Sequence, residues 1–208
     1  MDAADFRARV ETQRQTELDR LGSSKRLVAL TAAQLDDETV LRTAAASEAA
    51  AADLFADWAD DATGAAAETF AAFAEHERDH YERVVAELDD GDVEAESGAL
   101  HDYLWGLDST VERAGGVVGR GLVASRTLTQ FVGYFVNQAN EQRADLFREL
   151  KTETQADTET AVGLLADAAE DDDDWERARD AATGAVDAAY DEYVDALESM
   201  GVNAKSVC

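Results

Sequence analysis

The sequence predicts an all-α protein, a helical bundle with one crossover connection, on three observations. Its 208 residues include no proline, the residue that most strongly interrupts helices. Alanine, the best helix former, is abundant. No segment alternates apolar and polar residues between turn residues, as a half-buried strand would. A chain of this length can bury one substantial hydrophobic core.

The spacing of apolar residues and the helix breakers predict eight helical segments. They are expected over residues 5–21, 25–34, 37–61, 65–88, 100–113, 117–150, 157–169 and 175–200. Asp36 or Asp37 is expected to cap the third segment and Asp157 the seventh, because a carboxylate there accepts from free backbone N–H groups. Short breaks rich in Gly, Ser, Thr and Asp separate several of these segments, at residues 22–24, 63–64, 89–92 and 171–174.

A single domain is expected over residues 1–200, since no linker is long enough to separate two. Its parts are N-terminal helices (1–35), a helical hairpin (37–90), a connector (92–116), a second helical half (117–200) and a flexible tail (201–208). A cluster of glycines is expected to loosen the junction at the start of the second half; its members are Gly115, Gly116, Gly119 and Gly121. The cluster follows a helix and lacks the strand that a nucleotide-binding loop needs. We interpret it as small residues that let helices approach closely.

The charge excludes some partners. Acidic residues number 46 and basic residues 18, for a net charge of −28, and three of the basic residues are lysines. This composition resembles cytosolic proteins of salt-accumulating halophiles, because molar salt screens repulsion to within about 3 Å. An acidic decoy that mimics nucleic acid is the alternative. Direct nucleic-acid binding is not expected without a basic patch.

Membrane insertion is not expected either. The most apolar stretch, residues 116–136, contains Arg120 and Arg126, and the first residues after the initial Met are polar. We therefore expect a cytoplasmic protein. The lone cysteine, Cys208, excludes an intramolecular disulfide.

The stretch AEHERDH, residues 74–80, carries two overlapping metal-binding patterns. His76-Glu77-x-x-His80 has the letters of a zinc metalloprotease helix. Glu77-x-x-His80 has those of a di-iron carboxylate helix in a four-helix bundle. A charged surface helix without metal is the third interpretation.

Helical geometry separates these interpretations. On a helical wheel, Glu77 falls at the centre of the apolar stripe and His80 near its edge, whereas His76 lies at the margin of the polar face. The extended protease pattern HExxHxxGxxH fails, because Arg83 and Ala86 stand where it requires Gly and His. A zinc hydrolase therefore stays a remote alternative.

A second carboxylate lies on a core face. Glu48 is at the centre of the apolar stripe of segment 37–61. A buried, unpaired carboxylate costs several kcal/mol, so it normally has a partner or a metal. Both helices of one hairpin thus place a carboxylate inward, and His80 follows Glu77 on the same side. Together these residues form half of the ligand set of a di-iron site.

The segments SEAAAADLFADWA and AAFAEHERDHYERVVAEL resemble the first helical hairpin of the rubrerythrin and ferritin-like family. The resemblance covers residues 37–90. It implies a ferritin-like four-helix bundle with an extra N-terminal helix and a helical crossover connector, and it makes Glu48, Glu77 and His80 metal ligands. The implied cofactor is iron, as a di-iron centre or a single metal. The implied activity is that of a non-haem iron oxidoreductase, in iron oxidation or peroxide protection.

The second half of the chain departs from the family pattern. Its members supply another Glu and another ExxH there, but the histidines of this chain are His76, His80 and His101. Glu141 is a further candidate ligand, although on the wheel it faces away from the apolar stripe. One cysteine cannot build a cysteine-rich iron centre.

Three alternatives stay open for this half-site. One metal could bind with help from another carboxylate, or two protomers could complete a site across a homodimer interface. In the third, Glu77 and His80 pair with each other or with an arginine and no metal binds. The protein would then be a non-catalytic adaptor, or a regulator with a protein partner.

Overall fold

The computed structural model describes residues 3–91 and 93–204, which form helices joined by turns and loops, without a strand in these ranges. The prediction of an all-α protein is confirmed. The described helices are α1 (Ala3–Gln13), α2 (Gln15–Leu21), α3 (Lys25–Leu30), α4 (Asp37–Asp61), α5 (Ala65–Val85), α6 (Ala99–Trp105), α7 (Thr110–Asn137), α8 (Glu141–Ala168) and α9 (Asp172–Ser199).

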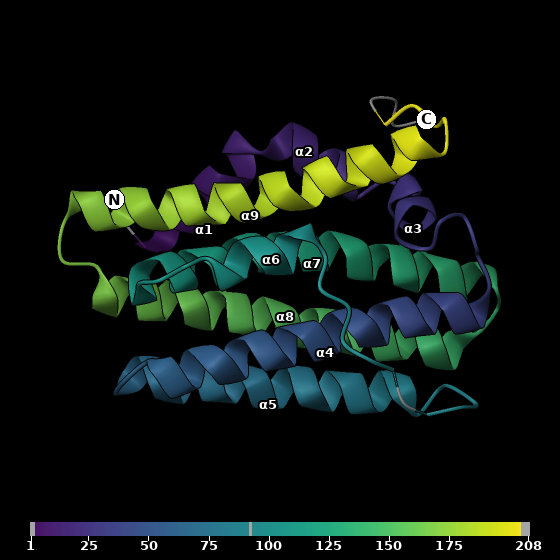
Figure 1. Cartoon of the computed structure of the whole chain (residues 1–208), viewed down its shortest axis with the longest axis horizontal. Helices are drawn as coiled ribbons and strands as arrows, with labels where there is room; N and C mark the ends of the chain where they lie inside the picture. The colour runs from purple at the N-terminus through teal and green to yellow at the C-terminus, as the bar shows by residue number, and fades with distance from the viewer. Residues whose placement is uncertain (1–2, 92, 205–208) are drawn as a thin grey trace.

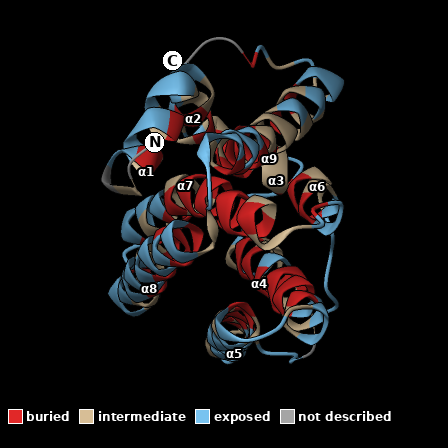
Figure 2. Ribbon diagram, turned by 90° about the vertical axis from the view of Figure 1, so that its left-hand side faces the viewer, coloured by how far each residue is buried: buried red, intermediate tan, exposed pale blue. Residues whose placement is uncertain are grey.

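Two antiparallel hairpins, α4–α5 and α7–α8, lie side by side, with α5 at the edge of the molecule (Figure 1). Helix α4 packs along α5, α7 packs along α8, and α5 contacts α8 between the two hairpins. Helix α9 runs along α7, and the short helices α1 to α3 lie beside α7, α8 and α9. The crossover between the hairpins, residues 86–109, contains α6. Helix α7 is therefore the central helix, and its first half is buried on nearly all sides (Figure 2).

Side-chain caps set where several helices begin. Asp36 accepts a hydrogen bond from the Thr39 backbone N–H at 2.9 Å and starts α4. Ser109 and Glu112 form a capping box at the start of α7. Each cap satisfies donors that the first turn of a helix leaves free.

The predicted helix ending near residue 150 is wrong. The chain turns at residues 138–140, where Ala139 adopts the left-handed conformation with φ 56° and Asn140 caps α8. The predicted cap at Asp157 is also wrong, because Asp157 lies in the middle of α8. Leu150, Thr154 and Ala161 continue one buried stripe through this region, so nothing ends the helix there.

The predicted helix over residues 100–113 divides into two. Helix α6 ends at Gly106 and α7 starts after Ser109. The glycine cluster lies inside α7 and does not loosen its start. The interpretation of close helix approach is confirmed, since a Cβ at Gly115 or Gly119 would overlap the α9 backbone.

The two ends of the chain differ from expectation in smaller ways. The first segment is interrupted at Arg14, between α1 and α2, as well as at the expected break over residues 22–24. In the tail expected to be flexible, Ala204 is buried, whereas Gly201 and Asn203 are exposed. The Lys25 ammonium also donates to the Asn203 carbonyl at 3.0 Å. Residues 205–208 lie outside the described residues.

Apolar side chains form two core regions along the four hairpin helices. One region contains Phe55, Phe70, Phe73 and Leu165, and the other contains Leu41, Val84, Phe131 and Phe147. On α4 and α5, Glu48 and the pair Glu77 and His80 lie between residues of the two regions. Buried polar groups thus occupy the zone where the two core regions meet.

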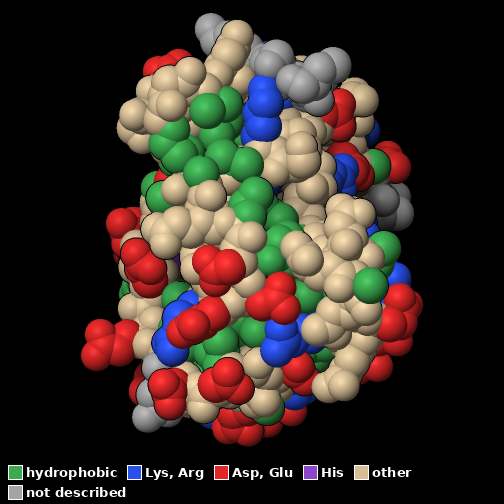
Figure 3. Space-filling view, turned by 90° about the vertical axis from the view of Figure 1, so that its right-hand side faces the viewer, with side chains coloured by type: hydrophobic (Ala, Val, Ile, Leu, Met, Phe, Trp, Pro, Cys, Tyr) green, Lys and Arg blue, Asp and Glu red, His purple; other side chains and the backbone are tan. Residues whose placement is uncertain are grey.

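The surface reflects the composition. Acidic side chains are spread over the end of the molecule shown in Figure 3, with a few basic side chains between them. None of the helices in the described ranges has the length and apolar character needed to cross a membrane.

Candidate metal centre

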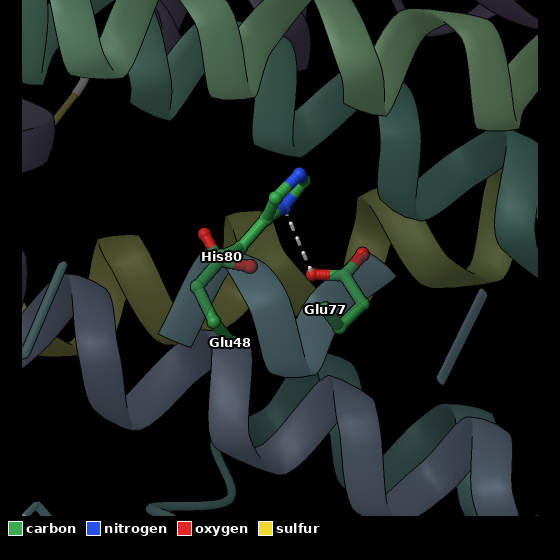
Figure 4. Close-up of side chains that lie close together, drawn as sticks. All are labelled: Glu48, Glu77 and His80. Atoms are coloured by element: carbon green, nitrogen blue, oxygen red, sulfur yellow. Dashed lines mark ion pairs between the residues drawn. The ribbon is translucent and has the colours of Figure 1, made fainter. Parts of the chain in front are cut away.

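Glu48, Glu77 and His80 meet in the core between the two hairpins (Figure 4). Glu48 comes from α4, and Glu77 and His80 come from α5. Each residue offers one ligand atom, and these atoms lie within 4.8 Å of one another. The three residues are 7%, 1% and 1% exposed. The sequence prediction of these three residues as one inward-facing group agrees with their positions.

Helical periodicity explains why these polar groups point inward. Glu48 has Ala44 and Ala51 about one turn away on the same face, and both are buried. On α5, the buried Phe73 lies about one turn before Glu77, and the buried Val84 lies about one turn after His80. The apolar residues determine which face turns inward, so the polar residues among them are carried into the core.

Two buried atoms in this group have no hydrogen-bond partner. They are Glu77 Oε2 and His80 Nδ1, and they face each other 3.6 Å apart. That distance is too long for a hydrogen bond. Buried polar atoms are normally paired, and each unpaired one in a native protein requires an explanation.

The other imidazole nitrogen of His80 is held firmly. His80 Nε2 lies 2.9 Å from Glu153 Oε2 on α8, and Arg83 donates to the same carboxylate oxygen at 2.8 Å. Histidines that bind metals typically have their second nitrogen fixed by a carboxylate in this way. Glu153 therefore orients the ring so that Nδ1 faces Glu77.

Arg120 supplies a positive charge beside both carboxylates. Its Nη1 donates to Glu77 Oε1 at 2.6 Å, and its Nη2 lies 3.5 Å from Glu48 Oε2. The guanidinium carbon also lies 5.4 Å from the centre of the Phe55 ring, within reach of a cation–π interaction. Arg120 is buried, so this ion pair is shielded from solvent.

The carboxylates respond in opposite directions to this environment. Burial raises the pKa of Glu48 well above its usual range, and the charge of Glu77 raises it further. Burial also disfavours ionised Glu77, but Arg120 and His80 outweigh burial and lower its pKa. Without a metal, a proton shared by the two carboxylates is therefore favoured on Glu48 and the negative charge on Glu77.

His80 and Arg120 are the basic residues of this group. Burial lowers the pKa of His80, but Glu77 and Glu153 outweigh that effect and raise it overall. Burial likewise opposes the charge of Arg120, and Glu77 and Glu48 outweigh it and raise its pKa. Arg120 thus pairs with Glu77, and His80 lies between Glu77 at 3.6 Å and the part-exposed Glu153 at 2.9 Å.

Two other residues of the sequence predictions lie elsewhere. Glu141 is the exposed first residue of α8 and pairs with Arg148 at 2.9 Å, so the structure does not bring it to this group. The His76 side chain is 55% exposed and its Nδ1 lies 2.9 Å from Asp157. His76 and His80 therefore do not converge on one position, as the HExxH zinc pattern requires.

Sequence reasoning missed Arg120, Glu153 and Asp157. Arg120 lies about one turn before Ala124 and two turns before Leu128, on a predicted apolar face, and a charge there is a signal for a buried partner. Glu153 and Asp157 were missed because the helix was expected to end near residue 150. Had α8 been recognised, their spacing of four would have placed them on one face.

Comparisons with family models, with curated proteins and with solved structures find no match. The resemblance to the rubrerythrin and ferritin-like family rests on the residues of the α4–α5 hairpin.

Proposed function

We propose that this protein binds a divalent metal ion, iron or manganese, through Glu48, Glu77 and His80. The observation that carries the proposal is the pair of unpartnered buried atoms, Glu77 Oε2 and His80 Nδ1, 3.6 Å apart. Donors about 2.1 Å from one ion lie roughly 3.0–3.4 Å apart. A small movement of either side chain would therefore let one ion bind both atoms.

The hydrogen bond from Arg120 leaves Glu77 Oε2 free to bind a metal ion. Arg120 donates to Oε1 of Glu77, whereas the unpartnered oxygen is Oε2. A metal would displace the proton of Glu48 and a proton of His80, in line with the deprotonated ligands that metals require. Arg120 would then hold the carboxylates in orientation from the side away from the ion.

The donor set indicates which metals are suitable. Two carboxylates supply hard oxygen ligands and one imidazole a borderline nitrogen, a set that suits iron or manganese. When bound, iron would supply redox chemistry towards oxygen or peroxide, the activity that the family resemblance implies. The residues of this chain would bind the ion, orient His80 through Glu153 and exclude water with the surrounding core.

The arrangement of helices supports the same family. Two antiparallel hairpins, α4–α5 and α7–α8, joined by a long crossover, are the architecture of ferritin-like bundles. We propose that the bundle is ferritin-like. Its second hairpin contributes Glu153 and Arg120 beside the candidate site, where the family pattern has another Glu and ExxH.

A second function is favoured by the ion pairs of Arg120. A guanidinium that contacts Glu77 and lies near Glu48 supplies the charge that a metal would otherwise supply. The protein would then be a metal-free helical bundle, acting as an adaptor or regulator through its surface. This function predicts that the purified protein binds no metal at all.

Metal content and affinity separate the two functions. Wild-type protein purified at high salt should carry iron or manganese near one equivalent, or take up Fe(II) or Mn(II) in equilibrium dialysis without oxygen. His80→Leu should lose this metal, since it removes the nitrogen ligand. Elemental analysis provides the measurement, and circular dichroism verifies the fold.

His76→Gln is the matched control, because it removes a histidine from the same helix that lies outside the group. It should keep full metal binding. Zinc that depends on both histidines would instead favour the HExxH alternative. Failure of the folded wild-type protein to bind Fe(II), Mn(II) or Zn(II) would contradict the metal proposal and leave the metal-free bundle.

A further inference from the structure

A pocket enters the molecule beside the candidate metal centre. Helices α3, α4, α6 and α9 line its outer part, a cavity of about 270 Å³. A smaller inner cavity of about 70 Å³ is lined partly by α7 and reaches Glu48 and Arg120. The two cavities share Arg26, Leu30, Thr43, Ser47, Leu100 and His101. They are therefore adjoining parts of one pocket, and the exposed Ser47 lies at its opening.

Two buried polar side chains that line both cavities each have a nitrogen without a hydrogen-bond partner. Arg26 and His101 are each 5% exposed, and neither Arg26 Nη1 nor His101 Nε2 has a hydrogen-bond partner among the described residues. The described contact of the Arg26 guanidinium is a long one, from Nε to the Thr127 hydroxyl at 3.3 Å. The pocket thus contains an unused donor on a buried cation.

The chemistry of these groups specifies the ligand. A guanidinium can only donate hydrogen bonds, so its partner must offer an acceptor oxygen. Burial lowers the pKa of Arg26 to about 10, which still leaves it charged at neutral pH. A carboxylate matches both its charge and its fork of donors. His101 Nε2 can donate to the same carboxylate.

The remaining walls are mostly apolar. Leu30, Leu100, Val123, Leu128 and Phe131 line the inner cavity. A ligand that reaches Arg26 would place its body against these side chains. Glu96 and Glu192 lie in the outer cavity, where they repel ligands with several negative charges. The combination selects a single negative charge attached to an apolar body.

We propose that this pocket binds a short aliphatic monocarboxylate, with its carboxylate on Arg26 and His101 and its chain among the apolar side chains. The ligand satisfies the two polar groups that the protein leaves unpaired. Binding requires no metal ion at the candidate centre, so the proposal is independent of the proposed function and is tested on metal-free protein.

Calorimetric titration with hexanoate, at neutral pH and fixed high ionic strength, tests the proposal. Saturable binding of one hexanoate per chain is expected. Hexanol has the same chain without the charge, and hexylammonium has the opposite charge; both should bind at least tenfold more weakly. In the series from acetate to octanoate, affinity should rise by up to about fourfold per methylene until the pocket is filled.

Two variants locate the binding. Arg26→Gln should lower hexanoate affinity at least tenfold, while Arg9→Gln, which removes the same charge from exposed α1, should leave it unchanged. Ser47→Phe narrows the opening at an exposed position that tolerates substitution, and it should also weaken binding at least tenfold. It keeps the test decisive if Arg26→Gln does not fold.

Several results would overturn the proposal. Wild-type protein that shows no saturable binding of any member of the series would do so. Equal affinity for hexanol would remove the role of the charge. Unchanged hexanoate binding in folded Arg26→Gln, or in Ser47→Phe, would place the ligand elsewhere on the molecule.

Discussion

Two arginines are buried to the same extent in this protein, and their surroundings differ. Arg120 and Arg26 are each 5% exposed. Arg120 donates to Glu77 at 2.6 Å and lies 3.5 Å from Glu48. Arg26 pairs with neither of these carboxylates. Its described hydrogen bond goes to the neutral Thr127 hydroxyl, and its Nη1 has no hydrogen-bond partner.

The two arginines differ in how far opposite charges offset the cost of burying them. Burying an ion costs several kcal/mol unless an opposite charge offsets it. At Arg120 the carboxylates outweigh burial and raise its pKa, whereas at Arg26 burial dominates and lowers its pKa to about 10. Arg120 is therefore compensated within the fold by carboxylates, whereas the charge of Glu192 raises the pKa of Arg26 by less than burial lowers it.

The largest predicted effect on stability comes from removing Arg120, the arginine whose charge is compensated by carboxylates. Arg120→Met leaves Glu77 buried without its counter-charge, and should lower the free energy of unfolding by about 3–5 kcal/mol. Chemical denaturation of metal-free protein at fixed high salt gives this value.

Arg26→Met is the matched control for that variant. It removes a buried charge that forms no ion pair with a carboxylate among the described residues, so the free energy of unfolding should stay unchanged or rise. Equal losses in the two variants would contradict the comparison, because they would mean that Arg26 is paired as firmly as Arg120.

The next effect concerns His101, which lines the pocket together with both arginines. Burial lowers its pKa to about 4, and the positive charge of Arg120 contributes. The unfolded value is about 6.5, so the unfolded chain binds the proton first as the pH falls. His101 therefore stabilises the fold above pH 6.5, and this stability is lost as the pH falls towards 4.

The loss should reach about 3 kcal/mol across that interval. His101→Leu should remove this part of the pH dependence, measured as unfolding free energies between pH 7 and pH 4 at fixed salt. Other groups titrate in the same range, so the difference between variant and wild type is the informative quantity. Parallel curves would show that His101 is not held neutral by its surroundings.

The two hairpins also differ in how well the sequence predicts them. The α4–α5 hairpin was predicted nearly to its ends, because Asp36 and Gly64 are recognisable start signals. The turn between α7 and α8 was not, since it places Ala139 at φ 56°, and alanine is the strongest helix former. Tertiary packing overrides the local preference there.

The residues of the candidate site show the same difference between the two hairpins. Glu48, Glu77 and His80 were predicted because each interrupts an apolar stripe on a correctly placed helix. Glu153 was missed with the helix that carries it. The pairing of Arg120 with Glu77 joins residues 43 positions apart in the sequence, and helical periodicity alone cannot assign a partner at that distance.

The smallest predicted effect sharpens the description of Arg120. Burial and the charge of Glu77 raise the pKa of Glu48 well above its usual range, so these surroundings favour the uncharged carboxyl in metal-free protein. Glu48→Gln is nearly isosteric, and should change the free energy of unfolding by less than about 1 kcal/mol.

The same substitution also tests the sign of the pH dependence. A raised folded pKa means that Glu48 stabilises the fold below its unfolded pKa of about 4.3, and that this stability declines as the pH rises through the folded value. Glu48→Gln should remove the decline, seen as a flatter stability curve above about pH 4.3. If Glu48→Gln costs as much as Arg120→Met, Glu48 is ionised in metal-free protein, and Arg120 then lies beside two buried negative charges.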